Sequence, residues 1–189
     1  MSKKRPEMFN KKASKSKYKA DQIIEKLALK PGQIIADIGS GGGYFTYRFA
    51  NIVGDKGKVY AVDTNEELLD FIKKQAKEKE LPNITTVLTA SEHSDLPKNK
   101  FDYIFMRNMT HHLTNRVDYF KNLKEMLKSD GKVVIIEYDG RGKFFSFQKL
   151  HRHFVPQQTI IDEMEKAGYA LHKSFDFLSE QSFTIFSID

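Results

Sequence analysis

The sequence predicts an α/β protein: a doubly wound, mostly parallel sheet of seven strands with an antiparallel C-terminal strand and helices on both faces. Three observations lead to this fold class. Short apolar runs that stop at glycine or acidic residues alternate with longer amphipathic segments along the 189 residues. The runs contain little polar alternation, which is typical of strands buried on both faces of a parallel sheet. Two strand-like segments follow one another at the C-terminal end, which favours a hairpin there.

The helices are expected where apolar residues recur at helical spacing, at residues 19–29, 44–53, 66–79, 117–127 and 158–167. Residues 30–32, Lys-Pro-Gly, end the first of these helices, and residues 129–131, Ser-Asp-Gly, follow the fourth. Residues 1–17 are rich in Lys and Ser without a hydrophobic period, so they are interpreted as a tail with Phe9 as a candidate anchor.

The strands are expected at residues 34–38, 58–62, 84–88, 101–106, 133–138, 169–175 and 183–188. Alternation of these strands with the helices implies right-handed crossovers. In such sheets the ligand binds beyond the carboxyl ends of the strands, where the winding reverses. The functional residues are therefore expected directly after the strands.

Charge is unevenly distributed along the chain, whose formal net charge is +6. Residues 1–30 hold ten Lys or Arg and three Asp or Glu, a net of +7, whereas residues 31–189 hold 21 and 22, a net of −1. Residues 1–18 are expected to be a basic tail, either solvated or acting as a flap that attracts an anionic substrate. Residues 19–189 are expected to form a single domain, and its neutral charge argues against a nucleic-acid partner.

The composition excludes several classes of protein. No apolar run approaches the roughly 20 residues that a membrane-spanning helix needs, and the N-terminal segment has no apolar stretch of a secretory signal. The chain has no cysteine, which excludes disulfides, thiolate metal sites and thiol catalysis. A cytoplasmic protein is expected.

Residues 37–44, Asp-Ile-Gly-Ser-Gly-Gly-Gly-Tyr, follow the first predicted strand. Glycines in such a loop let the chain turn tightly and let a ligand approach the backbone. The dinucleotide fingerprint G-x-G-x-x-G would place its third glycine at position 44, where this chain has Tyr44. A phosphate-binding loop would end in Gly-Lys-Ser/Thr, which is also missing. The loop therefore fits neither phosphate-binding pattern.

The loop instead resembles the D-x-G-x-G-x-G motif of class I S-adenosylmethionine-dependent methyltransferases, a Rossmann-like family. Other segments fall in that family's order and spacing: residues 59–63 with a terminal acid, Leu96-Pro97, residues 101–104 and residues 127–132. The resemblance extends over about residues 20–140 and implies a methyltransferase enzyme with S-adenosyl-L-methionine as its cofactor.

The resemblance also implies which residues bind the cofactor. Asp63 is expected to accept hydrogen bonds from both ribose hydroxyls, although it could instead cap the following helix. Asp37 is expected to order the loop and face the methionine ammonium. The implied cofactor-binding set is Asp37, Gly39, Ser40, Gly41, Gly43, Tyr44, Asp63, Thr64, Ala90, Ser91 and Asn108.

One position departs from the family pattern. Many relatives carry an acid just after the third strand that binds the adenine amino group, whereas this chain has Thr89 or Ala90 there. Adenine contact is therefore expected from the backbone of Ala90 and Ser91, and from Glu92.

The acceptor side is expected after the fourth and fifth strands. Residues 107–113, Arg-Asn-Met-Thr-His-His-Leu, lack the Asn/Asp-Pro-Pro-Tyr box of methyltransferases that act on exocyclic amines of bases. They resemble the His-His-Leu stretch of small-molecule and quinone-type methyltransferases. His111 and His112 are candidate general bases and His151 is a third catalytic candidate, while each histidine taken singly could simply pack at a helix start. No metal is expected, because no cluster of acids follows the fourth strand.

Residues 139–156 form a long segment with no clear periodicity that is rich in Phe, His and basic residues. It is interpreted as a substrate lid or pocket wall, with a short amphipathic helix as the alternative. The predicted function is methyl transfer from S-adenosylmethionine to a small-molecule acceptor, anionic or aromatic. The alternatives are an RNA or protein methyltransferase, or a non-catalytic cofactor-binding protein of the same fold.

Overall fold

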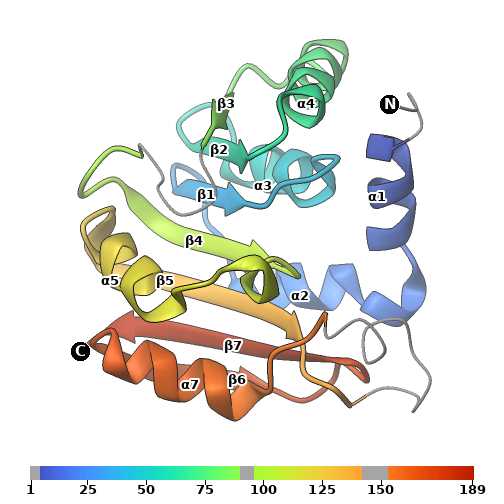
Figure 1. Ribbon diagram of the computed structural model, residues 1–189. Coiled ribbons are helices and arrows are strands. Elements are labelled where there is room, and N and C mark those ends of the chain that lie inside the picture. Colours follow the sequence, from blue (N-terminus) through green and yellow to red (C-terminus); the bar gives the residue numbers. More distant parts are fainter. Residues whose placement is uncertain (1–4, 90–95, 142–152) are drawn as a thin grey trace. The chain divides into compact units, whose positions relative to one another are not determined.

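The computed structural model describes residues 5–89, 96–141 and 153–189 (Figure 1). Contacts within the chain divide it into two compact units, Met1–Ala90 and Ser91–Asp189. Each unit is described by itself. Within the described residues, every helix is too short or too polar to cross a bilayer.

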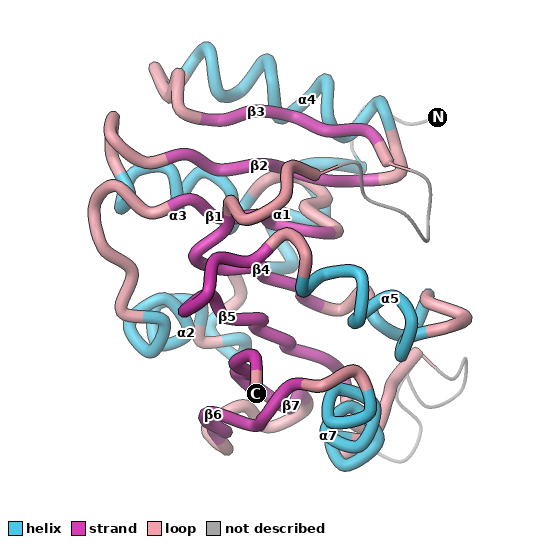
Figure 2. Tube along the Cα trace, turned by 90° about the vertical axis from the view of Figure 1, so that its left-hand side faces the viewer, coloured by secondary structure: helices cyan, strands magenta, loops and turns pink. Residues whose placement is uncertain are grey.

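The first unit contains three parallel strands, which run alongside one another in Figure 2. They are β1 (Ile34–Ile38), β2 (Lys58–Asp63) and β3 (Ile84–Leu88), and β2 pairs with both of the others. The helices of this unit are α1 (Arg5–Ala13), α2 (Ala20–Leu27), α3 (Tyr44–Val53) and α4 (Glu66–Glu78), with a short 3-10 helix η1 (Ser16–Tyr18). The predicted ranges of β1, β3 and α3 are confirmed.

Local sequence explains most of this unit. Ile35, Ala36 and Ile38 are at most 3% exposed, as expected for a strand buried on both faces. Helix α4 begins where the Asn65 side chain accepts a 3.3 Å hydrogen bond from the backbone N–H of Leu68, a typical N-cap. Apolar residues at helical spacing then face the core.

Helix α1 differs from the tail without regular structure that the sequence predicts. In the structure this segment packs on the glycine-rich loop: the Asn10 side chain donates a 2.7 Å hydrogen bond to the carbonyl of Gly42, and Pro6 is buried. The helix is thus stabilised by tertiary contacts rather than by an apolar stripe of its own, which is why periodicity missed it.

The second unit contains strands β4 (Phe101–Arg107), β5 (Leu127–Tyr138), β6 (Tyr169–Phe175) and β7 (Gln181–Ile188). Strands β4 and β5 are parallel, β7 is antiparallel to β5, and β6 completes a C-terminal hairpin with β7. The other elements are η2 (Thr110–His112), α5 (Arg116–Lys124) and α7 (Gln157–Lys166), and Figure 2 shows α7 beside the hairpin.

The strand order is β3-β2-β1-β4-β5-β7-β6. This mixed sheet with an antiparallel C-terminal hairpin confirms the predicted fold class.

The boundary between α5 and β5 corrects the sequence prediction. The helix ends at Lys124, three residues before the predicted end, and β5 begins at Leu127, six residues before the predicted start. Leu127 pairs with Phe101, and the register then shifts before Lys132 pairs with Tyr103. The Ser-Asp-Gly triplet is therefore an irregular part of the strand rather than a helix stop, because pairing with β4 overrides the local turn preference.

Candidate active site

The glycine-rich loop joins β1 to α3 at the carboxyl end of β1. The backbone N–H groups of Gly39 and Ser40 both donate to the carbonyl of Val62, at 2.8 and 3.1 Å, so the loop turns back over the end of β2. Gly39, Gly41 and Gly43 have φ angles of +75°, +56° and +82°. A side chain is disfavoured in this left-handed region, which explains the alternating glycines.

Two glycines of the loop are required by packing inside the protein. A Cβ at Gly43 would lie 2.7 Å from the Tyr47 ring, and a Cβ at Gly42 would lie 2.3 Å from the carbonyl oxygen of Pro6. Gly43 therefore allows α3 to begin, and Gly42 allows α1 to lie against the loop.

At Gly41, in contrast to Gly42 and Gly43, the structure leaves room for a side-chain atom. A Cβ built there would have as its nearest neighbour the Phe9 ring of α1, at an ordinary van der Waals distance of 3.8 Å. A ligand approaching the Gly41 backbone would thus meet Phe9 on one side.

Asp63, the last residue of β2, braces this loop. Its Oδ2 accepts a 2.9 Å hydrogen bond from the Gly41 N–H, and its Oδ1 accepts one of 3.0 Å from the Asn65 N–H. Asn65, not Asp63, caps α4. Each carboxylate oxygen has a second lone pair, so Asp63 can still accept hydrogen bonds from a ligand diol.

Asp37 lies near the end of β1 and is only 4% exposed. Its Oδ2 accepts a 2.5 Å hydrogen bond from the hydroxyl of Thr46, which is fully buried in the first turn of α3. Thr46 thereby orients the carboxylate from within the helix that follows the loop. Thr46 was not among the residues predicted from the sequence; a hydroxyl residue between the aromatic residues Phe45 and Tyr47 in the first turn of α3 is the signal that could have found it.

Replacing Thr46 by valine should lower the free energy of unfolding by about 1.5–3 kcal/mol, because a buried hydrogen bond to a carboxylate is lost. Urea denaturation measures this change. Thr46→Ser is the matched control, since it keeps the hydroxyl and loses about 1 kcal/mol with one methyl group. Equal losses in the two variants would contradict the importance of the hydroxyl.

The other predicted cofactor-binding residues of this unit differ in burial and in hydrogen bonding. The Ser40 hydroxyl is buried and has no hydrogen-bond partner among the described residues, so it is available to a ligand. The Tyr44 hydroxyl accepts a 3.3 Å hydrogen bond from Arg48, and Thr64 is exposed after β2. Ala90, Ser91 and Glu92 lie outside the described residues.

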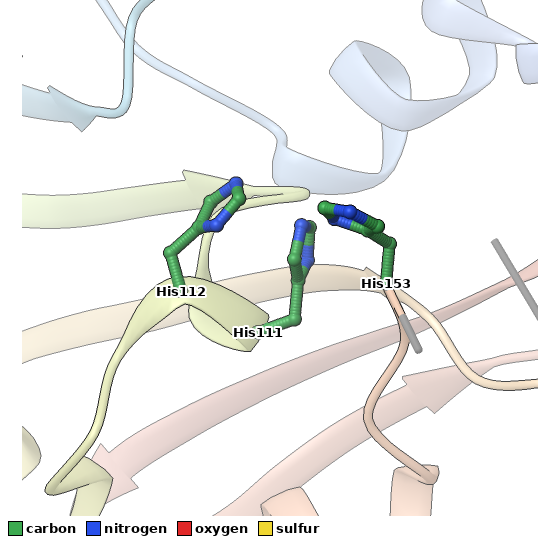
Figure 3. A group of neighbouring side chains, drawn as sticks. All are labelled: His111, His112 and His153. Carbon is green, nitrogen blue, oxygen red and sulfur yellow. The ribbon is translucent and has the colours of Figure 1, made fainter. Parts of the chain in front are cut away.

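In the second unit, three histidines come together after strands β4 and β5. His111 and His112 form part of η2, and His153 precedes α7 (Figure 3). The ring centroid of His111 lies 4.1 Å from that of His112 and 5.1 Å from that of His153. The predicted catalytic candidates His111 and His112 are thus joined by His153, which the sequence analysis did not single out; His151 lies outside the described residues.

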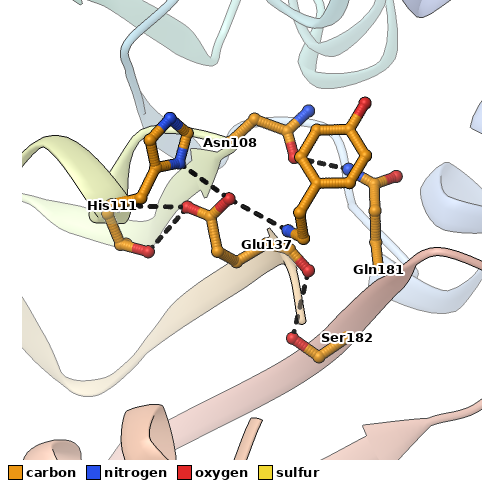
Figure 4. Close-up of polar contacts among 7 residues, drawn as sticks. Asn108, His111, Glu137, Gln181 and Ser182 are labelled. Atoms are coloured by element: carbon orange, nitrogen blue, oxygen red, sulfur yellow. Dashed lines mark hydrogen bonds and ion pairs between the residues drawn. The ribbon is translucent and has the colours of Figure 1, made fainter. Parts of the chain in front are cut away.

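The carboxylate of Glu137 in β5 holds His111 (Figure 4). Glu137 is fully buried; its Oε1 lies 3.0 Å from His111 Nδ1 and accepts a 2.9 Å hydrogen bond from the Tyr138 N–H. Its Oε2 accepts from the Thr110 hydroxyl at 2.7 Å and from the His111 N–H at 3.3 Å. A buried carboxylate with this set of donors is well satisfied, and it fixes the orientation of the imidazole.

Glu137 was missed by the sequence analysis, although an acidic residue inside the apolar run of β5 is a visible signal. The neighbouring His112 has its pKa lowered, first by the partial burial of its ring and then by the nearby His111 and His153, against a smaller opposite effect of Glu137. A lowered pKa keeps this imidazole neutral near neutral pH, which leaves one of its ring nitrogens with a lone pair that can coordinate a ligand.

Asn108, directly after β4, lies beside the C-terminal hairpin. Its side-chain oxygen accepts a hydrogen bond from the Gln181 side chain (Figure 4). Its backbone N–H donates to the Ile136 carbonyl at 2.8 Å. Asn108 has a positive φ of +53°, which asparagine tolerates. The Gln181 side-chain oxygen is buried without a partner among the described residues, so Gln181 is a further polar group that sequence reasoning missed.

The strand order and the glycine-rich loop, whose Gly41 N–H is held by Asp63 at the end of β2, are features of one family of enzymes. Residues 29–181 match the family described as a methyltransferase domain. The match spans most of the chain, so the chain belongs to the S-adenosylmethionine-dependent methyltransferases of class I, and S-adenosylmethionine is the methyl donor of this family. The family resemblance seen in the sequence is confirmed.

Individual relatives are more distant. The chain is 29% identical over 116 residues to the ubiquinone/menaquinone biosynthesis C-methyltransferase UbiE of Shewanella sediminis, a match spanning 61% of this chain and 46% of that protein. The alignment thus spans about half the length of the curated relatives. The fold is shared with a SAM-dependent methyltransferase from Aquifex aeolicus, with a TM-score of 0.85, 22% identity and coverage of 97% and 98% of the two chains. A geranyl diphosphate C-methyltransferase from Streptomyces coelicolor follows at a TM-score of 0.69, with 14% identity and coverage of 89% and 78%.

Proposed function

We propose that this methyltransferase acts on a small-molecule acceptor that contacts the histidines after β4. The observation that carries the proposal is the His111–Glu137 contact, in which a buried carboxylate orients an imidazole at the carboxyl end of a strand. In doubly wound sheets this is the edge where ligands bind. The relatives named for quinone biosynthesis and for geranyl diphosphate methylation support a small-molecule acceptor.

The residues of the glycine loop fit the cofactor. S-adenosylmethionine supplies an electrophilic methyl group on a sulfonium centre. Asp63 would hold the ribose hydroxyls through its remaining lone pairs, the Ser40 hydroxyl would gain a partner that the described residues do not supply, and the Gly41 backbone allows close approach. Asp37, held by Thr46, would face the methionine ammonium. The remaining task of the chain is to align the acceptor for in-line attack.

The neutral charge of residues 31–189 favours a small-molecule acceptor over RNA. A protein that binds nucleic acid neutralises phosphates with a basic surface, whereas this part of the chain carries 21 basic and 22 acidic residues. The excess of positive charge lies in residues 1–30, which hold ten basic and three acidic residues. We interpret residues 1–18 as a flap of a single catalytic domain.

The experiment that tests the function has two stages. Isothermal titration calorimetry with S-adenosylmethionine should show binding at one site per chain. Turnover is then followed with labelled methyl donor over three groups of acceptors: small phenols and quinones, bulk RNA, and protein extracts. Methylation confined to the small molecules is expected. Labelling of RNA or protein alone would support the alternative acceptors, and cofactor binding without any turnover would indicate a non-catalytic protein.

If the N-terminal segment acts as a flap, the Phe9 side chain should contribute to cofactor affinity. Phe9→Ala should weaken S-adenosylmethionine binding by about 1 kcal/mol, or about fivefold, because an aromatic face near a sulfonium contributes cation–π attraction. Phe9→Leu keeps apolar bulk without the ring, so it should show most of the same loss. Met8, 59% exposed on the same helix, provides the control Met8→Ala. Unchanged affinity in Phe9→Ala, measured by calorimetry, would show that the Phe9 ring does not contact the cofactor and that α1 is not a flap over it.

A further inference from the structure

We propose that His111, His112 and His153 form a binding site for one divalent transition-metal ion. Each imidazole offers one nitrogen, and these nitrogens all lie within 4.8 Å of one another. Figure 3 shows the rings gathered on the same side of η2, with His111 between the other two. Two of the donors belong to one turn of 3-10 helix, and the third comes from the segment before α7.

The spacing is close to what coordination requires. Metal–nitrogen bonds of about 2.0–2.1 Å in tetrahedral geometry place the ligand nitrogens about 3.4 Å apart. The widest separation in the cluster therefore has to close by roughly 1.4 Å. His112 is exposed and His153 is half-buried, so both rings can turn, whereas the His111 side chain is 8% exposed and held by Glu137.

Glu137 supplies the partner that metal-binding histidines characteristically have. A ligand imidazole usually donates its second ring N–H to a carboxylate, which fixes the tautomer and raises the basicity of the other nitrogen. His111 Nδ1 lies 3.0 Å from Glu137 Oε1, so Nε2 is left to face the cluster. The hydrogen bonds from Thr110 and Tyr138 keep the carboxylate itself in place. Glu137 is thus a positioning residue.

The donor set indicates the kind of ion. Imidazole nitrogens favour zinc, copper, nickel and cobalt, whereas magnesium and calcium prefer oxygen ligands. Three histidines leave at least one coordination position open, as in catalytic rather than structural zinc sites. This last step rests on the proposed function: the open position would take a heteroatom of the methyl acceptor, which favours acceptors with an anionic oxygen.

The test uses the full chain without a polyhistidine tag, stripped of metal with a chelator. Calorimetry with Zn²⁺ should show one ion per chain, Mg²⁺ should show none, and Co²⁺ should produce the intense visible absorption of a four-coordinate complex. His112→Ala and His153→Ala should each weaken Zn²⁺ binding at least about tenfold, and Glu137→Gln about 10- to 100-fold. His172→Ala, which changes an exposed histidine of β6, is the matched control and should leave binding unchanged.

The proposal is overturned if the stripped protein binds no Zn²⁺, or if it binds Zn²⁺ equally well in the His112 and His153 variants. These two side chains are exposed or half-buried, so their removal should not prevent folding, which circular dichroism checks. S-adenosylmethionine titration of the same samples keeps the two proposals separate. Cofactor binding without metal binding would overturn only the metal site, and metal binding without cofactor binding would overturn only the proposed function.

Discussion

Asp63→Ala should weaken S-adenosylmethionine binding by about 2–3 kcal/mol, or about 30- to 150-fold, the usual contribution of hydrogen bonds to a charged group. The carboxylate would bind the ribose directly, and it also holds the Gly41 N–H at 2.9 Å. Its removal therefore takes away a ligand contact and loosens the loop that the ligand approaches. Calorimetry at fixed salt measures the affinity.

Two further variants separate these effects. Asp63→Asn keeps one oxygen that can accept from the loop, so it should bind S-adenosylmethionine better than Asp63→Ala while remaining weaker than the unchanged protein. Asp70→Ala removes an exposed acid of α4 and is the control for charge alone. A loss below about 0.5 kcal/mol in Asp63→Ala would mean that this residue only orders the turn before α4.

Glu137→Ala should lower the free energy of unfolding by about 3 kcal/mol or more, because each buried donor left without an acceptor costs about 1–3 kcal/mol. The carboxylate accepts hydrogen bonds from the Thr110 hydroxyl and from the N–H groups of His111 and Tyr138, and it is fully buried. Urea denaturation followed by circular dichroism gives the change.

Glu137→Gln keeps the volume and one acceptor oxygen, so its loss should be smaller than that of Glu137→Ala. Thr184→Val is the control for an ordinary buried polar group: its hydroxyl donates a single 3.3 Å hydrogen bond to the Ile135 carbonyl, and about 1 kcal/mol should be lost. If Glu137→Ala lowers the free energy of unfolding no more than Thr184→Val does, the buried carboxylate does not stabilise this site as proposed.

The candidate cofactor residues of the glycine-rich loop are visible in the sequence because they lie within one short segment, residues 37–44. The turn between β1 and α3 requires glycine at positive φ, and Asp63, the acid at the end of β2, is only nineteen residues beyond Tyr44. Such patterns are local, so one sequence displays them. Their partners are not local: Thr46 bonds Asp37 across the loop, and Asp63 reaches Gly41 only when β1 and β2 pair.

The histidine cluster, unlike the glycine-rich loop, could not be predicted from one short segment of the sequence. The adjacent His111 and His112 are visible in the sequence, but His153 joins them only because the chain returns to η2 after β5. The expectation of no metal considered clusters of acids after the fourth strand, whereas the candidate ligands here are imidazoles from two distant segments. The sequence also shows Glu137 inside an apolar strand without showing which donors satisfy it.

By itself the sequence determined the alternation of strands and helices, the parallel sheet with its C-terminal hairpin, and the glycine loop of a methyltransferase, because each depends on the spacing of neighbouring residues. Only the tertiary structure decided that residues 5–13 form a helix against Gly42 and that β5 begins at Leu127 opposite Phe101. It also decided that a buried glutamate orients one of three gathered histidines. These features depend on contacts between segments far apart in the chain, whose energies outweigh local preferences and leave no periodic trace in the sequence.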